Sequence, residues 1–140
     1  MDTLVARLQD TLSSDQATRD AAEQYLAHET LPKSGTDDVL GVQLAQILSE
    51  ASLSLFVRQA AAIALKKYVR KRWSIFFDTF TQDMVVNGIV QTVDATPVEA
   101  KEHIRTSLLA CLCDAEPKVR SQASDILSLI SSCDFPDHFP

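Results

Sequence analysis

Glycine, proline and cysteine are scarce in this sequence, and each shortage excludes a class of structure. The 140 residues include 3 glycines, 5 prolines and 3 cysteines, whereas Ala, Leu, Gln, Lys and Arg are abundant. Few helix breakers and many helix formers favour a helical chain over a sheet-rich one. Because the number of cysteines is odd, we expect reduced thiols and not a disulfide-stapled framework.

Long apolar runs are also missing. No run approaches the roughly 18 apolar residues that a membrane-spanning helix requires. The opening residues MDTLVARLQD lack the basic start and apolar block of a secretory leader. With 46% apolar and 23% charged residues the composition is that of an ordinary globular protein. We therefore expect a soluble, non-secreted chain of about one domain, without membrane contacts.

Catalytic signatures are absent as well. The sequence contains no GxGxxG or GxxxxGK[ST] phosphate loop, no GxSxG elbow and no HExxH helix. His28, His103 and His138 are scattered along the chain. Cys111 and Cys113, two positions apart on a predicted helix, point about 200° away from each other and do not form a joint metal site. We expect neither an enzyme nor a bound cofactor or metal.

The charge distribution is uneven. The net charge is -6, which does not suggest general binding to nucleic acid, and we expect no direct nucleic-acid partner. Yet five cations fall among the seven residues 66–72. They either complement the dipole at the end of a helix or form a contact patch for a partner. Both interpretations stay open, because the same side chains serve both.

Residues 57–73 carry the clearest helical pattern in the chain. Apolar side chains recur there at the spacing of one helical stripe. The stripe consists of Val57, Ala60, Ala61, Ala64, Leu65 and Tyr68. Its alanines allow a neighbouring helix to approach closely, so we expect the stripe to be buried. The opposite side is expected to face a partner, and it carries Gln59, Ile63, Lys66, Lys67 and Arg70.

The helical pattern repeats. An arginine followed by alanine three or four positions on and by leucine seven positions on begins at Arg19, at Arg58 and at Arg120. Arg19 and Arg58 are 39 residues apart, close to the period of HEAT and armadillo repeats. The longer gap to Arg120 is explained if residues 74–95 are an insertion. The sequence thus predicts an all-α fold, an α-solenoid of about three HEAT-like helical hairpins with an insertion between the second and third.

The expected boundaries follow from these patterns. We expect one domain over residues 1–140, a fragment of a longer solenoid, with hairpins at about 2–31, 36–73 and 96–133. Within the insertion, residues 74–80 are expected to form a loop and residues 81–93 a helix. Thr96 is the expected N-cap of the helix that follows, with Pro97 as its first helical residue.

The second helices of stacked hairpins line one surface of a solenoid. The arginines that begin them either pair with a nearby acid, for which Asp15, Asp114 and Glu116 are candidates, or contact a partner. We favour the first interpretation. The side chains expected to bind a partner point away from the core of these helices. They are Glu23, Gln24, Gln59, Ile63, Lys66, Lys67, Arg70 and Asp125, with Ser121 and Ser124 beside the last.

Three motifs carry a resemblance to a known family. They are an AAExxL helix at residues 21–26, the run LKKYV at residues 65–69 followed by Trp73, and the closing DFP at residues 134–136. In this combination the chain resembles the N-terminal domain of the importin-β (karyopherin-β) superfamily over almost its whole length. It departs from the family in having Lys67 where Asn is frequent, and Phe135 and Phe139 where Trp is frequent. Within the family it is most similar to the importin-nine type.

The resemblance implies a function. Receptors of this family bind the small GTPase Ran in its GTP form through the second helices of their first repeats. They carry protein cargo through nuclear pores, with contacts to nucleoporins, and shuttle between cytoplasm and nucleus. The importin-nine type carries histones and other basic nuclear proteins. The alternative is a generic HEAT-repeat scaffold for protein–protein interaction, which would be indifferent to the nucleotide on Ran.

Overall fold

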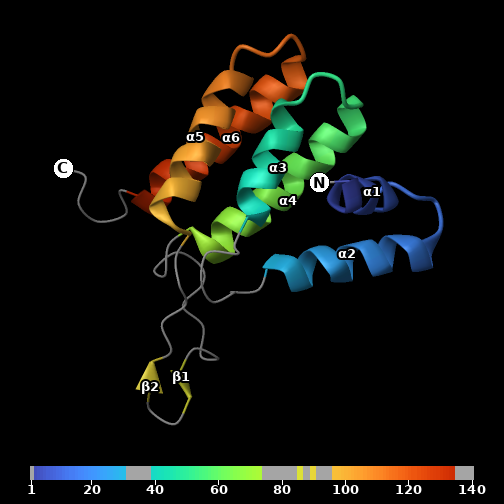
Figure 1. The fold of residues 1–140 in the computed structure, drawn as a ribbon, viewed down its shortest axis with the longest axis horizontal. Helices are drawn as coiled ribbons and strands as arrows, with labels where there is room; N and C mark the ends of the chain where they lie inside the picture. Colours follow the sequence, from blue (N-terminus) through green and yellow to red (C-terminus); the bar gives the residue numbers. More distant parts are fainter. Residues whose placement is uncertain (1, 31–38, 74–84, 87–88, 91–95, 135–140) are drawn as a thin grey trace.

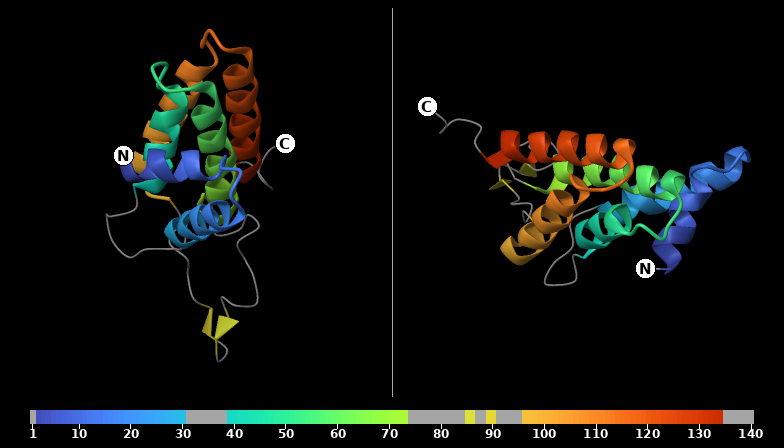
Figure 2. Two further views of the ribbon diagram at one scale, coloured as in Figure 1. Left: turned by 90° about the vertical axis from the view of Figure 1, so that its right-hand side faces the viewer. Right: turned by 90° about the horizontal axis from the view of Figure 1, so that it is seen from above.

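The computed structural model describes residues 2–30, 39–73, 85–86, 89–90 and 96–134 (Figure 1). Six helices lie in this part of the chain and follow one another in three pairs. The pairs α3–α4 and α5–α6 are antiparallel, whereas α1 and α2 cross at a steep angle (Figures 1 and 2). They are α1 (Asp2–Asp10), α2 (Gln16–Thr30), α3 (Leu40–Ser49), α4 (Leu55–Arg72), α5 (Val98–Cys111) and α6 (Pro117–Asp134). The predicted all-α fold of HEAT-like hairpins is confirmed.

The second and third hairpins form two layers. Helices α4 and α6 run side by side in one layer, and α3 and α5 form the other (Figure 2). Helix α4 is central, since it contacts α3 and α6 as well as both helices of the first hairpin. Helix α2 is inclined to α4 and does not continue the side-by-side row of α4 and α6 (Figures 1 and 2). The first hairpin therefore meets the others obliquely. The expectation that the three second helices line one surface is correct for α4 and α6 and wrong for α2.

The core follows the alanine-lined stripe of α4. Every residue of that stripe is buried, as predicted from Val57 to Tyr68. Helix α4 is also buried on further sides, because Ala62 and Val69 are fully covered too. The sequence pattern missed this, since a helix with neighbours on several sides buries more than one stripe.

Gly41 sets how closely α3 approaches α4. A Cβ atom on Gly41 would lie 2.5 Å from Cε1 of Tyr68 and 2.9 Å from Cδ1 of Ile104. Real Cβ atoms do not come so near other carbons, because the repulsion is too strong. The absence of a side chain at Gly41 thus allows the Tyr68 ring to pack against the backbone of α3.

Arg58 joins the second hairpin to the third. Its guanidinium is buried and donates through Nε to the Leu48 carbonyl oxygen at 2.9 Å. It also donates to both carboxylate oxygens of Asp114, in the turn between α5 and α6. The backbone N–H of Glu116 donates to the same carboxylate at 2.9 Å. The pairing expected between Arg58 and a nearby acid is confirmed.

The other two repeat arginines make local contacts. Arg120 donates to the backbone carbonyl of Asp114 at 2.7 Å, and Arg19 donates to the side-chain carbonyl of Gln16 at 2.6 Å. Asp15 instead caps α2, because its carboxylate accepts from the hydroxyl and the backbone N–H of Thr18. Those hydrogen bonds lower the pKa of Asp15 below its ordinary value. Of the three arginines, Arg58 has the ion pair between hairpins.

Thr96 joins the two ends of the insertion by hydrogen bonds, and it does not cap a helix. Its backbone N–H and its hydroxyl both donate to the Arg72 carbonyl oxygen, each at 2.7 Å, and its Oγ1 lies 3.2 Å from the Tyr68 hydroxyl. The N-cap of α5 is Pro97, without a side-chain cap. The prediction of Thr96 as N-cap and Pro97 as first helical residue is therefore wrong, because Thr96 satisfies a carbonyl at the end of α4.

The prediction of a helix over residues 81–93 is wrong for the four residues of this range that the structure describes. Strand β1 (Val85–Val86) pairs antiparallel with β2 (Ile89–Val90). β-Branched residues favour strands, and Asn87-Gly88 between them is the sequence typical of a two-residue hairpin connection. The loop expected at residues 74–80 lies outside the described residues, as does the closing DFP motif beyond residue 134.

Candidate partner-binding surface

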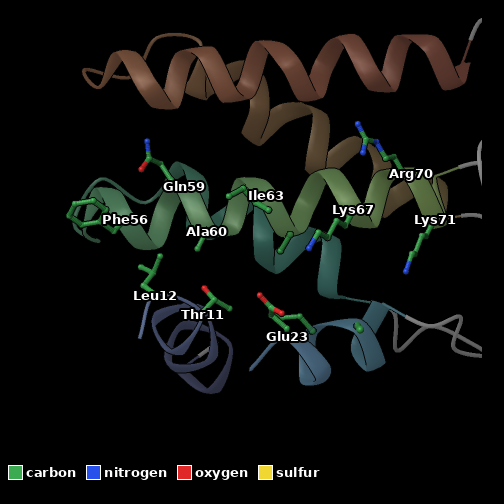
Figure 3. A pocket seen from close by; sticks show the side chains of 13 residues that line it. Thr11, Leu12, Glu23, Phe56, Gln59, Ala60, Ile63, Lys67, Arg70 and Lys71 are labelled. Carbon is green, nitrogen blue, oxygen red and sulfur yellow. The ribbon is translucent and has the colours of Figure 1, made fainter. Parts of the chain in front are cut away.

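A groove of about 660 Å³ separates α4 from the first hairpin (Figure 3). We call it the α2–α4 groove. It forms where the inclined α2 leaves the outer side of α4 uncovered. It is lined by Thr11, Leu12, Glu23, Leu26, Ala27, Phe56, Gln59, Ala60, Ile63, Ala64, Lys67, Arg70 and Lys71.

Five of the eight residues expected from the sequence line this groove. They are Glu23, Gln59, Ile63, Lys67 and Arg70. The last four recur every three or four positions along α4, so the helix presents them on one side. Ile63 is 52% exposed, an unusual position for a large apolar side chain on a helix whose other faces are buried.

Two more of the expected residues pair with each other. Lys66 Nζ lies 3.6 Å from Oδ2 of Asp125, which connects α4 to α6. Both line a second groove of about 370 Å³, the α4–α6 groove, together with Arg70 and Ser128. Their charges already neutralise one another, so a partner has to compete with this ion pair for either of them.

The remaining expected residues lie outside both grooves. Gln24 is exposed on α2, and Ser121 and Ser124 are exposed on α6. The surface expected from the sequence is thus divided, with half of its ten residues in the α2–α4 groove.

Eight of the thirteen lining residues are not among those expected to bind a partner, and three of these eight lie at the ends of the groove (Figure 3). Leu12 is 52% exposed and Phe56 is 68% exposed, and Lys71 lies at the far end of the groove. Phe56 is seven positions before Ile63, so the spacing that placed Ile63 on the outer side of α4 also places Phe56 there. That signal was available in the sequence. Leu12 carried none, because it follows the end of α1 and its position depends on the packing of the first hairpin.

The cations of residues 66–72 do not act as one patch. Arg72 is 2% exposed and its guanidinium lies 5.8 Å from the centre of the Tyr68 ring, inside the protein. Lys67, Arg70 and Lys71 line the α2–α4 groove. Lys67 and Lys71 are directed toward α2, whereas Arg70 extends toward the α6 side of α4 and also lines the α4–α6 groove (Figure 3). Within the described part of the chain, these three make no ion pair closer than 4.0 Å. The groove is therefore positively charged at this end, with Glu23 as the nearby acid.

Other kinds of site were also sought among the described residues. They contain no group of three or more His, Cys, Asp or Glu side chains that could hold a metal ion. Cys111 is buried, which raises the pKa of its thiol, whereas Cys113 is exposed. None of the helices described is long and apolar enough to cross a membrane.

Comparison with known proteins identifies a family. Residues 27–114 match the family described as the importin-beta N-terminal domain. The chain is 31% identical over 130 residues to Importin subunit beta-5 of Saccharomyces cerevisiae, covering 91% of the chain and 12% of that protein. It is 26% identical over 137 residues to Exportin-2 of Drosophila melanogaster, covering 98% and 12%. It is 27% identical over 133 residues to Importin-9 of the same fly, covering 95% and 12%.

Proposed function

The chain belongs to the importin-beta N-terminal domain family, and on that premise we propose that it is part of a nuclear transport receptor that binds Ran in its GTP form. The similar proteins are importins and exportins and not enzymes. The chain spans only 12% of the length of each. The proposal therefore concerns the binding of Ran by this region. Carrying cargo is a property of the whole receptor.

The α2–α4 groove is the observation that carries this proposal. It combines an exposed apolar side chain, Ile63, with the unpaired cations Lys67 and Arg70. Protein interfaces typically have an apolar centre and are enriched in arginine. We propose that the eight residues expected from the sequence contact Ran, with Gln59, Ile63, Lys67 and Arg70 at the centre of the contact and Glu23 on its opposite wall. Gln24, Lys66 and Asp125 lie at its margin.

The domain organisation forms part of the same proposal. We place an importin N-terminal domain over residues 1–140, as a fragment of a longer solenoid, with hairpins at about 2–31, 36–73 and 96–133. Residues 74–95 are its insertion. The helix pairs and the share of each relative that the chain covers support this organisation.

For cargo we propose import of basic nuclear proteins such as histones, as in the importin-nine type. The match to Importin-9 and the net charge of -6 support this. The receptor would shuttle between cytoplasm and nucleus and reach nucleoporins through its full length. Matches to Exportin-2 at similar identity make the direction of transport a separate question. The sign of the coupling answers it: weaker cargo binding in the presence of Ran-GTP supports import, and stronger cargo binding contradicts it.

Ran binding by the natural full-length protein tests the proposal. We expect tighter binding to Ran loaded with a non-hydrolysable GTP analogue than to Ran-GDP. Arg70→Glu should weaken binding about tenfold, since reversing a contact charge costs on the order of 1.4 kcal/mol. Lys66→Glu combined with Arg70→Glu should weaken it further, without loss of helicity. Lys118→Glu, an exposed cation on α6 outside both grooves, is the matched control.

Two results would point elsewhere. Equal binding to both nucleotide states would support a generic HEAT-repeat scaffold. Binding to DNA or RNA with a steep salt dependence would instead indicate a protein that tracks nucleic acid.

A further inference from the structure

We infer that the α2–α4 groove takes a segment of the GTPase surface in which an apolar side chain stands beside acidic ones. Leu12, Phe56 and Lys71 then become contact residues in addition to those proposed above. This inference rests on the proposed function, which it deepens by assigning each end of the groove its own kind of contact.

The groove changes character along α4. Phe56, Ile63 and Arg70 are seven positions apart, which is close to two helical turns, so they lie on one side of the helix. At a rise of 1.5 Å per residue, neighbouring members of this series are separated by about 10.5 Å. Figure 3 shows Leu12 and Phe56 at one end of the groove and Arg70 and Lys71 at the other.

The apolar end is open to solvent. Leu12 comes from the turn after α1 and Phe56 from the first turn of α4, and each exposes more than half of its surface. Together with Ile63 they form three of the seven exposed large apolar side chains in the described ranges. Gathering so many in one groove favours a partner that removes them from water.

The cationic end selects the charge of the partner. Lys67, Arg70 and Lys71 outnumber Glu23 there, so the local charge is positive although the chain as a whole is negative. An acidic side chain brought to this end gains charge-assisted hydrogen bonds, and a basic one is repelled. The two ends together therefore fit a segment that is apolar where it meets Phe56 and acidic where it meets Arg70.

Two double variants of the natural full-length protein test each end separately. Leu12→Ser with Phe56→Ser removes the apolar end, and Lys67→Glu with Lys71→Glu reverses the cationic end. Binding to Ran loaded with a non-hydrolysable GTP analogue is measured at low and at high salt. We expect each double variant to bind about tenfold more weakly than the wild type.

The salt dependence distinguishes the ends. The wild type and the apolar-end variant should lose affinity equally as salt increases, since both keep the charge contacts. The cationic-end variant should show a flatter salt dependence. The matched controls are Leu109→Ser, a 57% exposed apolar side chain on α5, and Lys118→Glu on α6. Both controls should bind like the wild type.

Each other outcome overturns the inference in a recognisable way. If the wild type prefers Ran-GTP but both double variants bind within twofold of it, the proposed function stands and this inference is wrong. Tighter binding after charge reversal would mean that the groove meets a basic segment. Self-association of the wild type that the variants abolish would identify a second copy as the occupant. No binding of wild type to Ran-GTP would remove both proposals.

Unfolding must be excluded as the cause of any loss. All four altered side chains line an open groove, so we expect melting temperatures close to that of the wild type. If a double variant melts early, Phe56→Ala and Lys71→Gln repeat the comparison with smaller changes. Loss of binding by a stably folded variant then supports the inference, and unchanged binding overturns it.

Discussion

Arg58 of α4 and Asp114 of the α5–α6 turn form an ion pair between hairpins, with side chains only 3% and 12% exposed. The same guanidinium also donates to the Leu48 carbonyl oxygen at the end of α3. One buried cation thus connects α4 to the end of α3, 10 residues away, and to the α5–α6 turn, 56 residues away. A buried charge is tolerated only while its partners are present.

Removing the carboxylate should therefore destabilise the fold. Asp114→Ala leaves Arg58 buried without its counter-charge, and we expect the free energy of unfolding to fall by about 3 kcal/mol or more. Urea denaturation followed by circular dichroism measures it. Asp125→Ala is the matched control, because its carboxylate belongs to the far more exposed pair with Lys66 and should change stability by less than about 1 kcal/mol. Equal effects of the two variants would contradict the structural role of Arg58.

Stability should also depend on pH through Asp114. Hydrogen bonds from the Arg58 guanidinium, and next from the Glu116 N–H, lower the pKa of Asp114 below its ordinary value. The unfolded carboxyl has a pKa of about 3.9, so this stabilisation is fully present above that pH and is lost as pH falls through the lower folded pKa. We expect the stability difference between wild type and Asp114→Asn to be constant from pH 7 to about 5 and to shrink below about pH 4. A difference that stays constant down to pH 2 would exclude this linkage.

Gly41→Ala should destabilise the protein although alanine is the better helix former. At an unhindered helix position the change stabilises by about 0.5–1 kcal/mol. Here the added Cβ would meet the Tyr68 ring at 2.5 Å, and displacing packed side chains costs about 1–3 kcal/mol. We expect a net loss, measured as a lower urea midpoint. Gln46→Ala, at an exposed position of the same helix, should change stability by only about 0.5 kcal/mol.

Glutamate substitutions at two positions of α4, two residues apart, should affect different properties: one the stability of the fold and the other the binding of Ran-GTP. Ala61 is fully buried, so Ala61→Glu places an unpaired carboxylate in a helix interface and should cost several kcal/mol. Ile63 is 52% exposed, so Ile63→Glu should leave the melting temperature nearly unchanged and weaken binding to Ran-GTP. Thermal melts and binding of both variants check this. Unfolding by Ile63→Glu would show that the outer side of α4 is assigned wrongly.

The sequence predicted the hairpins because their signals are local. The alanine-lined stripe from Val57 to Tyr68 follows directly from helical periodicity, and so does the exposure of Ile63. The pairing of Arg58 with an acid was also foreseen, and Asp114 was one of the three candidates named for the repeat arginines. Periodicity also placed four of the eight groove-lining residues of α4 on its outer face.

Other features depend on contacts that no local pattern contains. Arg72 belongs by sequence to a basic cluster, yet it is buried against Tyr68. The chain that resumes at residue 96 lies against this end of α4. Thr96 has the sequence of a helix cap, but its hydroxyl bonds to the Arg72 carbonyl oxygen, 24 residues earlier. The inclination of α2, and the groove that it opens, likewise follow from packing between hairpins. Two missed features did have a usable signal: the β1–β2 pair in Asn87-Gly88, and the position of Phe56 in its spacing from Ile63.

The bond between the Thr96 N–H and the Arg72 carbonyl has a practical consequence for protein engineering. It holds the two ends of residues 74–95 close together. An inserted domain needs attachment points that are close to each other in this way. The entropic cost of closing such a loop rises by only about 0.6 kcal/mol for each doubling of its length. A fluorescent reporter with closely spaced termini, transplanted between Trp73 and Thr96, should therefore leave the stacking of α4 against α6 unchanged.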